Sequence, residues 1–270
     1  MSRPSLPETE SLPSHSGPLQ SDPLLQVRDL AKSYGPKTIL DGVSFDLDPG
    51  ETLVILGRSG SGKSVTLRLL NGLESPDRGS VLFDGTELCT LTERQLFPIR
   101  RRMAMLFQSG ALFDSMNVFD NIAFPLREHT DKSPSEIADV VAAKLNLVRL
   151  SGVEQQMPSS LSGGMKKRVA LARSLALDPE LVLYDEPTTG LDPVTSAVIA
   201  QLILKSRDSL GASAVVVTHD LPLARAVGHR IAFLENGRFR FIGTWNEADQ
   251  RDDPVLHGFL EGRAEVDDGI

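Results

Sequence analysis

The sequence lacks the marks of a secreted or membrane-spanning protein. Its 270 residues include a single cysteine, Cys89, so no disulfide can form within the chain and nothing favours an oxidising compartment. Although 40% of the residues are apolar, no uninterrupted apolar stretch approaches the roughly 18 to 20 residues that cross a bilayer. We therefore expect a chain that stays in the cytoplasm and does not span a membrane by itself.

An excess of positive charge is also absent. Acidic residues outnumber basic residues by 36 to 28, and the net charge of −8 disfavours general attraction to nucleic acid or anionic lipid. Any phosphate binding must therefore be local. Two short basic runs, Arg100–Arg102 and Lys166–Arg168, are typical of solvated helix faces, with a partner contact as the alternative.

The length of the chain allows one large domain. Residues 1–23 are rich in proline and serine and contain no apolar segment of the signal-peptide type, which favours a disordered tail. Residues 24–262 show no internal repeat, so we expect them to form one copy of a single domain. A short C-terminal tail is expected at residues 263–270.

Apolar periodicity predicts an α/β fold. Residues Leu24–Leu30 and Thr38–Leu47 alternate apolar and polar side chains around a Gly-Pro turn, which predicts an antiparallel hairpin. Residues Thr52–Leu56 form a short apolar run that ends at a glycine-rich loop and a helical pattern. Further buried strands are expected at Met103–Phe107, Leu181–Tyr184, Ala214–Val217 and Ile231–Leu234. Their alternation with helical stretches predicts a mainly parallel sheet behind an N-terminal antiparallel β subdomain.

Between two of these strands lies a stretch with no strand pattern. Within residues 109–160, helical spacing is found at Asn121–Arg127 and Ser135–Val148. We therefore expect a helical subdomain, at about residues 109–178, inserted into the α/β core.

A phosphate-binding loop follows the first buried strand. The sequence fits the pattern G-x-x-x-x-G-K-[ST] and lies between a predicted strand and a predicted helix, as a P-loop NTPase core requires. Its glycines let backbone N–H groups point at phosphates, its lysine supplies a positive charge, and its serine offers a hydroxyl to Mg²⁺. The residues are Gly57, Arg58, Ser59, Gly60, Ser61, Gly62, Lys63 and Ser64. Position 65, which follows this serine, is occupied by Val65 and not by a threonine, so we expect no nucleotide-binding hydroxyl there.

Two adjacent acids end the strand at Leu181–Tyr184. Asp185 and Glu186 should lie at the sheet edge that carries the phosphate loop. We predict that Asp185 holds Mg²⁺ through water and that Glu186 acts as general base on the water that attacks the γ-phosphorus. Together the two acids indicate hydrolysis of a nucleoside triphosphate.

A second anion site is predicted at Ser162, Gly163 and Gly164, which precede a helical pattern. A capping hydroxyl and unobstructed N–H groups at a helix N-terminus attract phosphate. Since one nucleotide does not need two such sites, we expect two copies of the chain to sandwich two ATP molecules in a symmetric dimer.

With these motifs the sequence resembles the ATP-binding cassette (ABC) family over residues 24–262. The resemblance implies an ATPase that works with ATP and Mg²⁺ as a homodimer and powers a transporter whose transmembrane permease is a separate chain. It also implies that Tyr34 stacks on adenine and that Gln108 is a Mg²⁺ ligand that senses the attacking water. Ser64 and Asp185 would be the other metal-binding residues.

The same resemblance assigns roles at the dimer interface. Ser162 and Gly164 would contact the ATP of the opposite subunit, with Gly163 between them. Asp192 would cross the interface, and His219 would contact the γ-phosphate.

The segment after Gln108 refines the resemblance. Residues 109–130, together with residues 253–262, resemble the Mla/Mce-type ATPases, which serve transport of phospholipid or other hydrophobic substrates between the inner and outer membranes. The resemblance implies a peripheral location on the cytoplasmic face of the inner membrane, an Mce-domain partner, and docking of the permease on the segment. The candidate docking residues are Leu112, Phe113, Met116 and Phe119, with core packing as the alternative for each.

Three other classes of protein share some of these motifs. A chromosome-organising or DNA-repair ATPase would carry long heptad repeats before Ser162, and none is found. A translation factor would carry two cassettes and a basic surface, whereas this chain has one cassette, is acidic and is not expected to bind nucleic acid. The ATPase of a polar-solute importer, such as one for amino acids, stays open as the alternative because the substrate does not touch this subunit.

Overall fold

The computed structural model describes residues 22–262, so the expected C-terminal tail and all but Asp22 and Pro23 of the expected N-terminal tail lie outside the described residues. The strands are β1 (Leu25–Tyr34), β2 (Lys37–Leu47), β3 (Thr52–Leu56), β4 (Arg78–Phe83), β5 (Thr86–Glu87), β6 (Met103–Leu106), β7 (Leu181–Asp185), β8 (Ser213–Thr218), β9 (Arg230–Glu235) and β10 (Arg238–Thr244). The helices are α1 (Lys63–Leu70), α2 (Glu93–Arg100), α3 (Val118–His129), α4 (Pro134–Leu147), a 3₁₀ turn (Pro158–Ser160), α5 (Gly163–Ser174), α6 (Pro193–Leu210), α7 (Leu221–Val227), α8 (Trp245–Gln250) and α9 (Pro254–Leu260). Among residues 22–262, no helix combines the length and apolarity that a membrane crossing requires.

The larger sheet has six strands in the order β10-β9-β3-β8-β7-β6. Its pairs are parallel except for the hairpin β9–β10. Every residue of β3, β7 and β8 is buried, as expected for parallel strands covered on both faces. Because these strands run in the same direction, the loops that follow them meet at one edge of the sheet, where the predicted phosphate loop and acids lie.

The smaller sheet is antiparallel, in the order β2-β1-β4-β5. The predicted N-terminal hairpin is confirmed, with Leu25 opposite Leu47 and Tyr34 opposite Lys37. Strands β4, β5 and β10 were not expected. They are held in two tight hairpins whose turns, Asp84-Gly85 and Asn236-Gly237, adopt positive φ at both positions.

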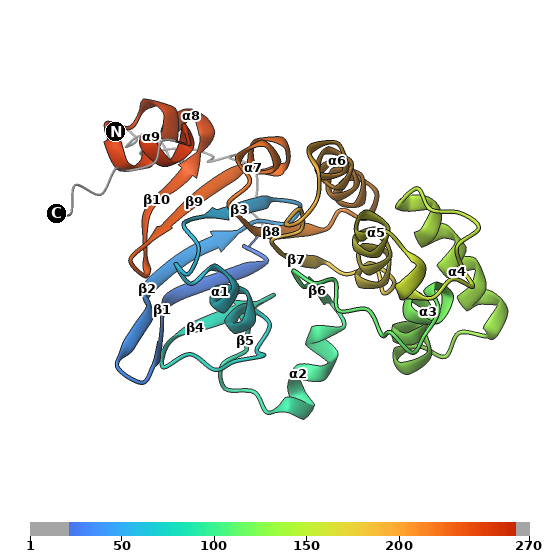
Figure 1. Cartoon of the computed structure of the whole chain (residues 1–270). Helices are drawn as coiled ribbons and strands as arrows, with labels where there is room; N and C mark the ends of the chain where they lie inside the picture. Colours follow the sequence, from blue (N-terminus) through green and yellow to red (C-terminus); the bar gives the residue numbers. More distant parts are fainter. Residues whose placement is uncertain (1–21, 263–270) are drawn as a thin grey trace, which may run out of the picture.

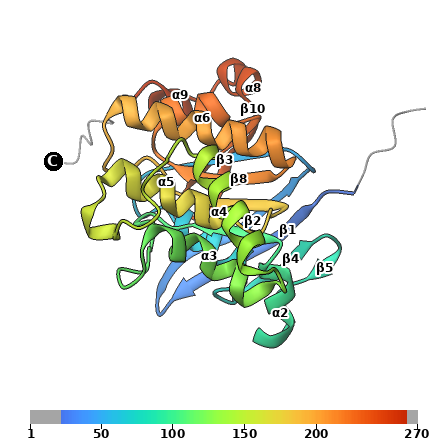
Figure 2. The ribbon, with the colours of Figure 1, turned by 90° about the vertical axis from the view of Figure 1, so that its right-hand side faces the viewer.

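The helices α3, α4 and α5 lie together at the end of the molecule opposite β1 and β2 (Figure 1). Seen from that end, α3 and α4 stand in front of the large sheet (Figure 2). Local sequence explains where these helices begin: Asn117 caps α3 by accepting from the N–H of Asp120 at 2.7 Å, and Ser133 and Glu136 form a capping box at α4. The helical insertion between β6 and β7 that the sequence predicts is present.

Candidate functional site

The phosphate loop joins the buried strand β3 to α1. Gly60 and Gly62 adopt φ of 79° and 107°, a region that side chains with a Cβ rarely enter. A Cβ at Gly57 would lie 2.6 Å from the carbonyl oxygen of Leu234. Glycine is therefore required by the backbone at these positions, and the resulting curl presents the N-terminus of α1 to the edge of the sheet.

Lys63 is the first residue of α1 and is only 6% exposed. Its Nζ donates to the carbonyl oxygens of Gly57 at 2.8 Å and Arg58 at 3.1 Å, so the ammonium spans the loop. The same Nζ lies 3.4 Å from Oε1 of Glu186. A buried positive charge thus faces both the loop and the acid at the end of β7.

Ser64 and Asp185 bring two oxygen groups together. The Ser64 hydroxyl donates to Oδ1 of Asp185 at 2.7 Å, and Asp185 is buried at the end of β7. Burial raises the pKa of the Asp185 carboxyl, the hydrogen bond from Ser64 opposes the rise, and the charge of Glu186 adds to it. Residues 22–262 contain no cluster of three His, Cys, Asp or Glu side chains able to hold a metal, but Mg²⁺ needs only one or two protein oxygens when phosphates and water complete its shell.

The residue after Ser64 has a different role. Position 65 is occupied by Val65, which has no hydroxyl. Its side chain is partly buried and packs against the hydrophobic core that the two sheets share with α1. The side chain at position 65 therefore contributes to the packing of α1.

Glu186 lies at the centre of the site. Its backbone has a φ of 46°, which is unfavourable for a residue with a side chain and is typical of functional positions. Oε2 accepts hydrogen bonds from Thr218 Oγ1 at 3.3 Å and Thr189 Oγ1 at 3.4 Å, and lies 2.9 Å from Nδ1 of His219. The carboxylate is therefore fixed by groups from the ends of two adjacent strands, and sequence reasoning had not identified the two threonines.

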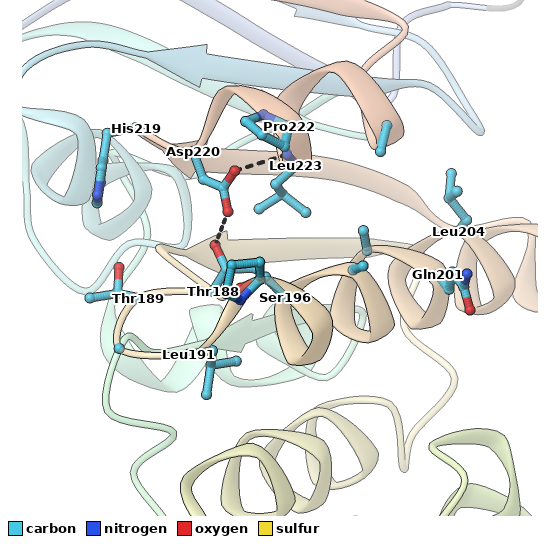
Figure 3. Close-up of a pocket in the computed structure, with 15 residues that line it drawn as sticks. Thr188, Thr189, Leu191, Ser196, Gln201, Leu204, His219, Asp220, Pro222 and Leu223 are labelled. Atoms are coloured by element: carbon cyan, nitrogen blue, oxygen red, sulfur yellow. Dashed lines mark hydrogen bonds between the residues drawn. The ribbon is translucent and has the colours of Figure 1, made fainter. Parts of the chain in front are cut away.

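His219 follows β8 and remains largely exposed, with 63% of its side chain accessible. The next residue, Asp220, accepts from Thr188 Oγ1 at 2.8 Å and caps α7 by accepting from the N–H of Leu223 at 3.0 Å (Figure 3). These bonds tie the loop after β7 to the loop after β8. Beside them a hollow of about 640 Å³ lies between α6 and α7, and His219 forms part of its wall.

Two further residues, Gln108 and Tyr34, are predicted to contact the nucleotide and lie far from Asp185 and Glu186 along the chain. Gln108 is exposed just after β6, and its backbone carbonyl accepts a hydrogen bond from Lys167 Nζ. Tyr34 ends β1 and is 45% exposed, and its hydroxyl donates to Glu74. Lys32 Nζ lies 5.6 Å from the centre of the Tyr34 ring.

The second predicted anion site opens α5. Ser162 is the N-cap and accepts from the N–H of Met165 at 3.3 Å, while no atom lies close to where a Cβ would be placed on Gly163. Gly164 faces α6, because a Cβ there would lie 2.7 Å from Thr195 Cγ2. Asp192 caps α6 by accepting from the N–H groups of Val194 and Thr195, each at 3.0 Å. The exposed Ser162 and the capped end of α6 therefore lie on adjoining helices.

One expectation about the basic runs is wrong. Lys167 was expected on a solvated face, but it is only 7% exposed, because its side of α5 packs on the chain leaving β6. Arg102 also belongs to an ion-pair network, with Asp84 and Glu180 at 2.6 Å each. Periodicity alone could not distinguish these residues from their exposed neighbours.

Comparison with known proteins agrees with this geometry. The family model described as ABC transporter matches residues 40–189. The chain is 41% identical over 242 residues to the intermembrane phospholipid transport system ATP-binding protein MlaF of Escherichia coli K12, covering 90% of both chains. It is 46% identical over 239 residues to the probable ribonucleotide transport ATP-binding protein mkl of Mycobacterium leprae, covering 88% of this chain and 69% of the relative.

A solved structure shows the same fold. The dimeric post-hydrolysis state of the ATP-binding cassette MJ0796 bound to ADP and Pi superposes with a TM-score of 0.76 at 32% identity, covering 82% of this chain and 98% of that chain. The family expected from the sequence and the α/β cassette fold are both confirmed. This chain belongs to the ABC transporter family, in which it is an ATP-binding, ATP-hydrolysing subunit.

Proposed function

We propose that ATP is hydrolysed at the edge where β3, β7 and β8 end, with Mg²⁺ held between Ser64 and Asp185. The observation that carries this proposal is the direct hydrogen bond between these two side chains at 2.7 Å, beside the phosphate loop. A hydroxyl and a carboxylate are oxygen donors that suit Mg²⁺. The metal, with Gln108 as a further ligand, would neutralise charge on the β- and γ-phosphates.

Within this site Glu186 orients the attacking water and accepts its proton. Lys63 and the N–H groups of the loop stabilise the negative charge that develops on the γ-phosphoryl oxygens. His219 lies against Glu186 and has an exposed ring that can reach the γ-phosphate. Tyr34 would stack on the adenine, and the remaining loop residues, Arg58, Ser59, Gly60 and Ser61, would surround the phosphates.

We also propose that two copies of the chain share each ATP. Ser162 and Gly163 are exposed at the start of α5, and with Gly164, which faces α6, they can receive the phosphate of a nucleotide bound to a second copy. Asp192 would lie at the same interface. The solved relative is described as a dimer, which supports this arrangement.

The transporter is proposed to carry phospholipid or another hydrophobic substrate between the inner and outer membranes. The similarity to MlaF extends over 90% of both chains, and residues 109–130 carry the resemblance to Mla/Mce-type ATPases. The subunit would then lie on the cytoplasmic face of the inner membrane, bound to a permease and, through it, to an Mce-domain protein. A polar-solute transporter is the second candidate, because the similar mycobacterial protein is named for ribonucleotide transport.

The permease is proposed to dock in a hollow of about 570 Å³ between α2, α3 and the chain after β6. Three aromatic side chains at this hollow remain exposed: Phe97 by 56%, Phe107 by 37% and Phe113 by 41%. Of the other expected docking residues, Leu112 and Phe119 are partly buried and pack against the core that the large sheet shares with the helices of the insertion. Phe113 lies outside this core, but its ring contacts Phe124 and the Arg173 guanidinium, so a test of docking at Phe113 also requires the melting temperature.

The test is purification of the chain from its own membranes, with and without Phe113→Asp. A charge placed in an apolar contact costs several kcal/mol, so the variant should lose the permease while keeping its melting temperature and ATP binding. Leu73→Asp is the matched control, since Leu73 is 46% exposed and does not line the hollow.

The partners of the wild-type chain decide between the two substrate classes. An Mce-domain protein and co-purifying phospholipid would support lipid transport. A binding protein for small polar solutes would support the second candidate instead. Retention of the permease by Phe113→Asp would refute the docking surface.

A further inference from the structure

The proposed mechanism makes no use of Lys167, although this side chain is a buried cation beside the catalytic acids. Its exposure is 7%, and among residues 22–262 no carboxylate lies within ion-pair distance of its Nζ. Burial lowers the pKa of the ammonium, while the negative charges of Asp185 and Glu186 act in the opposite direction. The charge of Lys167 therefore interacts with Asp185 and Glu186, the two acids of the proposed ATP site.

Two backbone carbonyl oxygens accept hydrogen bonds from the Lys167 ammonium. Nζ donates to the carbonyl oxygen of Gln108 and lies 3.5 Å from the carbonyl oxygen of Glu186, a long hydrogen bond. Gln108 begins the segment that leaves β6, and Glu186 directly follows β7. A single side chain of α5 therefore connects the ends of two neighbouring strands.

Helix α5 also holds the rest of the segment after Gln108. Arg173 Nη2 donates to the carbonyl oxygen of Gly110 at 2.9 Å, and its guanidinium lies 5.4 Å from the centre of the Phe113 ring. A Cβ on Gly110 would lie 3.2 Å from Cβ of Ala170. Lys167, Ala170 and Arg173 are spaced by three residues and share one face of the helix, so the segment and α5 form one packed unit.

Stability alone does not account for a lysine at this position. A buried ammonium without a paired carboxylate loses hydration that two carbonyls restore only in part, and an apolar side chain of similar length would avoid that cost. The position is nevertheless occupied by a charged lysine, whose ammonium contacts the backbone carbonyl of Glu186.

We propose that Lys167 is a positioning residue for ATP hydrolysis. It holds the backbone of Glu186 to the segment that begins at Gln108, so the carboxylate is aligned when α5 and this segment are seated together. The inference rests on the proposed role of Glu186 as the general base. It adds a connection from the surface at Phe113, through α5, to the reacting water.

The experiment measures steady-state ATP hydrolysis by the full chain carrying Lys167→Met. This change removes both hydrogen bonds and keeps an apolar stem. We expect kcat to fall about tenfold or more, with the KM for ATP unchanged and the melting temperature equal or higher. Lys166→Met is the matched control, because Lys166 lies on the same helix and is expected to behave as wild type.

Combination with Glu186→Gln separates positioning from a general structural role. If Lys167 acts through Glu186, Lys167→Met should cause no further loss of single-turnover rate in the Glu186→Gln background, whereas independent effects would multiply. Wild-type kcat in Lys167→Met, multiplying effects, or a parallel loss of ATP affinity would each overturn the proposal. If Lys167→Met does not fold, Lys167→Arg takes its place in the same comparison. We expect Lys167→Arg to have a normal melting temperature and to cause no further loss of single-turnover rate in the Glu186→Gln background.

The same set of variants distinguishes this proposal from the one on which it rests. Wild-type turnover in Glu186→Gln alone would remove Glu186 from the role of base and overturn the proposed mechanism. Loss of turnover in Glu186→Gln with full turnover in Lys167→Met would leave the mechanism in place and refute only the role of Lys167.

Discussion

The two regions proposed to bind phosphate, the edge of the large sheet and the adjoining starts of α5 and α6, differ in how their acids are held. At the edge of the sheet, Asp185 is buried and its pKa is raised by that burial. At the start of α6, Asp192 is exposed and its pKa is lowered by hydrogen bonds from Thr195. An ionised Asp185 therefore costs the fold stability, whereas an ionised Asp192 contributes to it. The buried Asp185 therefore fits the proposed contact with a cation, whereas Asp192 is already hydrogen-bonded to its own helix, which leaves that helix end for the proposed contact with a second copy.

The largest expected effect comes from the buried region. Glu186→Gln should lower kcat by about 10² to 10⁴-fold, because it removes the proposed base while keeping the shape of the side chain. ATP binding should persist and trap a closed dimer, which gel filtration with ATP detects. Lys63→Ala should instead weaken ATP binding itself, since it deletes the charge at the phosphates. Normal turnover in Glu186→Gln would show that Glu186 is not the general base, and would contradict the catalytic role proposed for the edge of the sheet.

The next effect joins the two regions across a dimer. A Lys63→Ala subunit and a Ser162→Arg subunit should each be inactive alone, because every shared site is damaged. Mixed dimers contain one site with both defects and one intact site, so hydrolysis should recover to a measurable fraction of wild type. Crosslinking checks that mixed dimers form, and Ser162→Asn, which preserves the cap of α5, controls for loss of the helix end. Mixtures no more active than either parent would contradict a shared site.

The smallest expected effects are on the melting temperature, which substitution of Asp185 should raise and substitution of Asp192 should lower. The raised pKa of Asp185 means that its stabilising contribution is complete below its unfolded pKa and is lost as the pH rises through its folded pKa. In the absence of nucleotide and Mg²⁺, Asp185→Asn should therefore melt above wild type at pH 7, and the difference should shrink toward pH 4.

Asp192 provides the reverse case. Its pKa is lowered, so its contribution is present above the unfolded pKa and is lost as the pH falls through the folded pKa. Asp192→Ala should melt about 2–4 °C below wild type at pH 7, and the difference should narrow in acid. Asp192→Asn retains a capping oxygen and serves as the control. Differential scanning calorimetry from pH 4 to pH 7 measures the melting temperatures of Asp185→Asn and Asp192→Ala against wild type. Shifts of the same sign in the two variants would contradict the proposed difference between the two acids.

The sequence predicted those parts of the molecule whose chemistry is contiguous along the chain. The loop between β3 and α1, the acids Asp185 and Glu186 at the end of β7 and the serine cap of α5 each combine a short motif with its flanking element, so spacing was sufficient to place them. Strands β4 and β10 were missed although a signal was present. Asp84-Gly85 and Asn236-Gly237 both adopt positive φ, and such dipeptides favour tight hairpins.

Other features depend on tertiary packing that no local pattern encodes. Phe113 and Phe119 lie six positions apart, yet Phe113 is exposed and Phe119 packs on the core. Lys166 and Lys167 are adjacent, and only Lys167 is buried. Which member of each pair turns inward is decided by contacts with other parts of the fold, as Lys167 shows with the carbonyl oxygens of Gln108 and Glu186.

The pairing of β6 with β7 has a consequence for how such a molecule can change over evolutionary time. Leu106 lies opposite Tyr184 in these adjacent parallel strands, so all of α3, α4 and α5 belongs to one crossover connection. The entropy of closing a connection rises only slowly with its length. The part of this connection that carries α3 and α4 can therefore lengthen or shorten while β6 and β7 keep their register, provided that Gln108 and α5 keep their contacts with the end of β7. A change in α3 and α4 would then alter the surface offered to a partner without altering the sheet edge that carries Asp185 and Glu186.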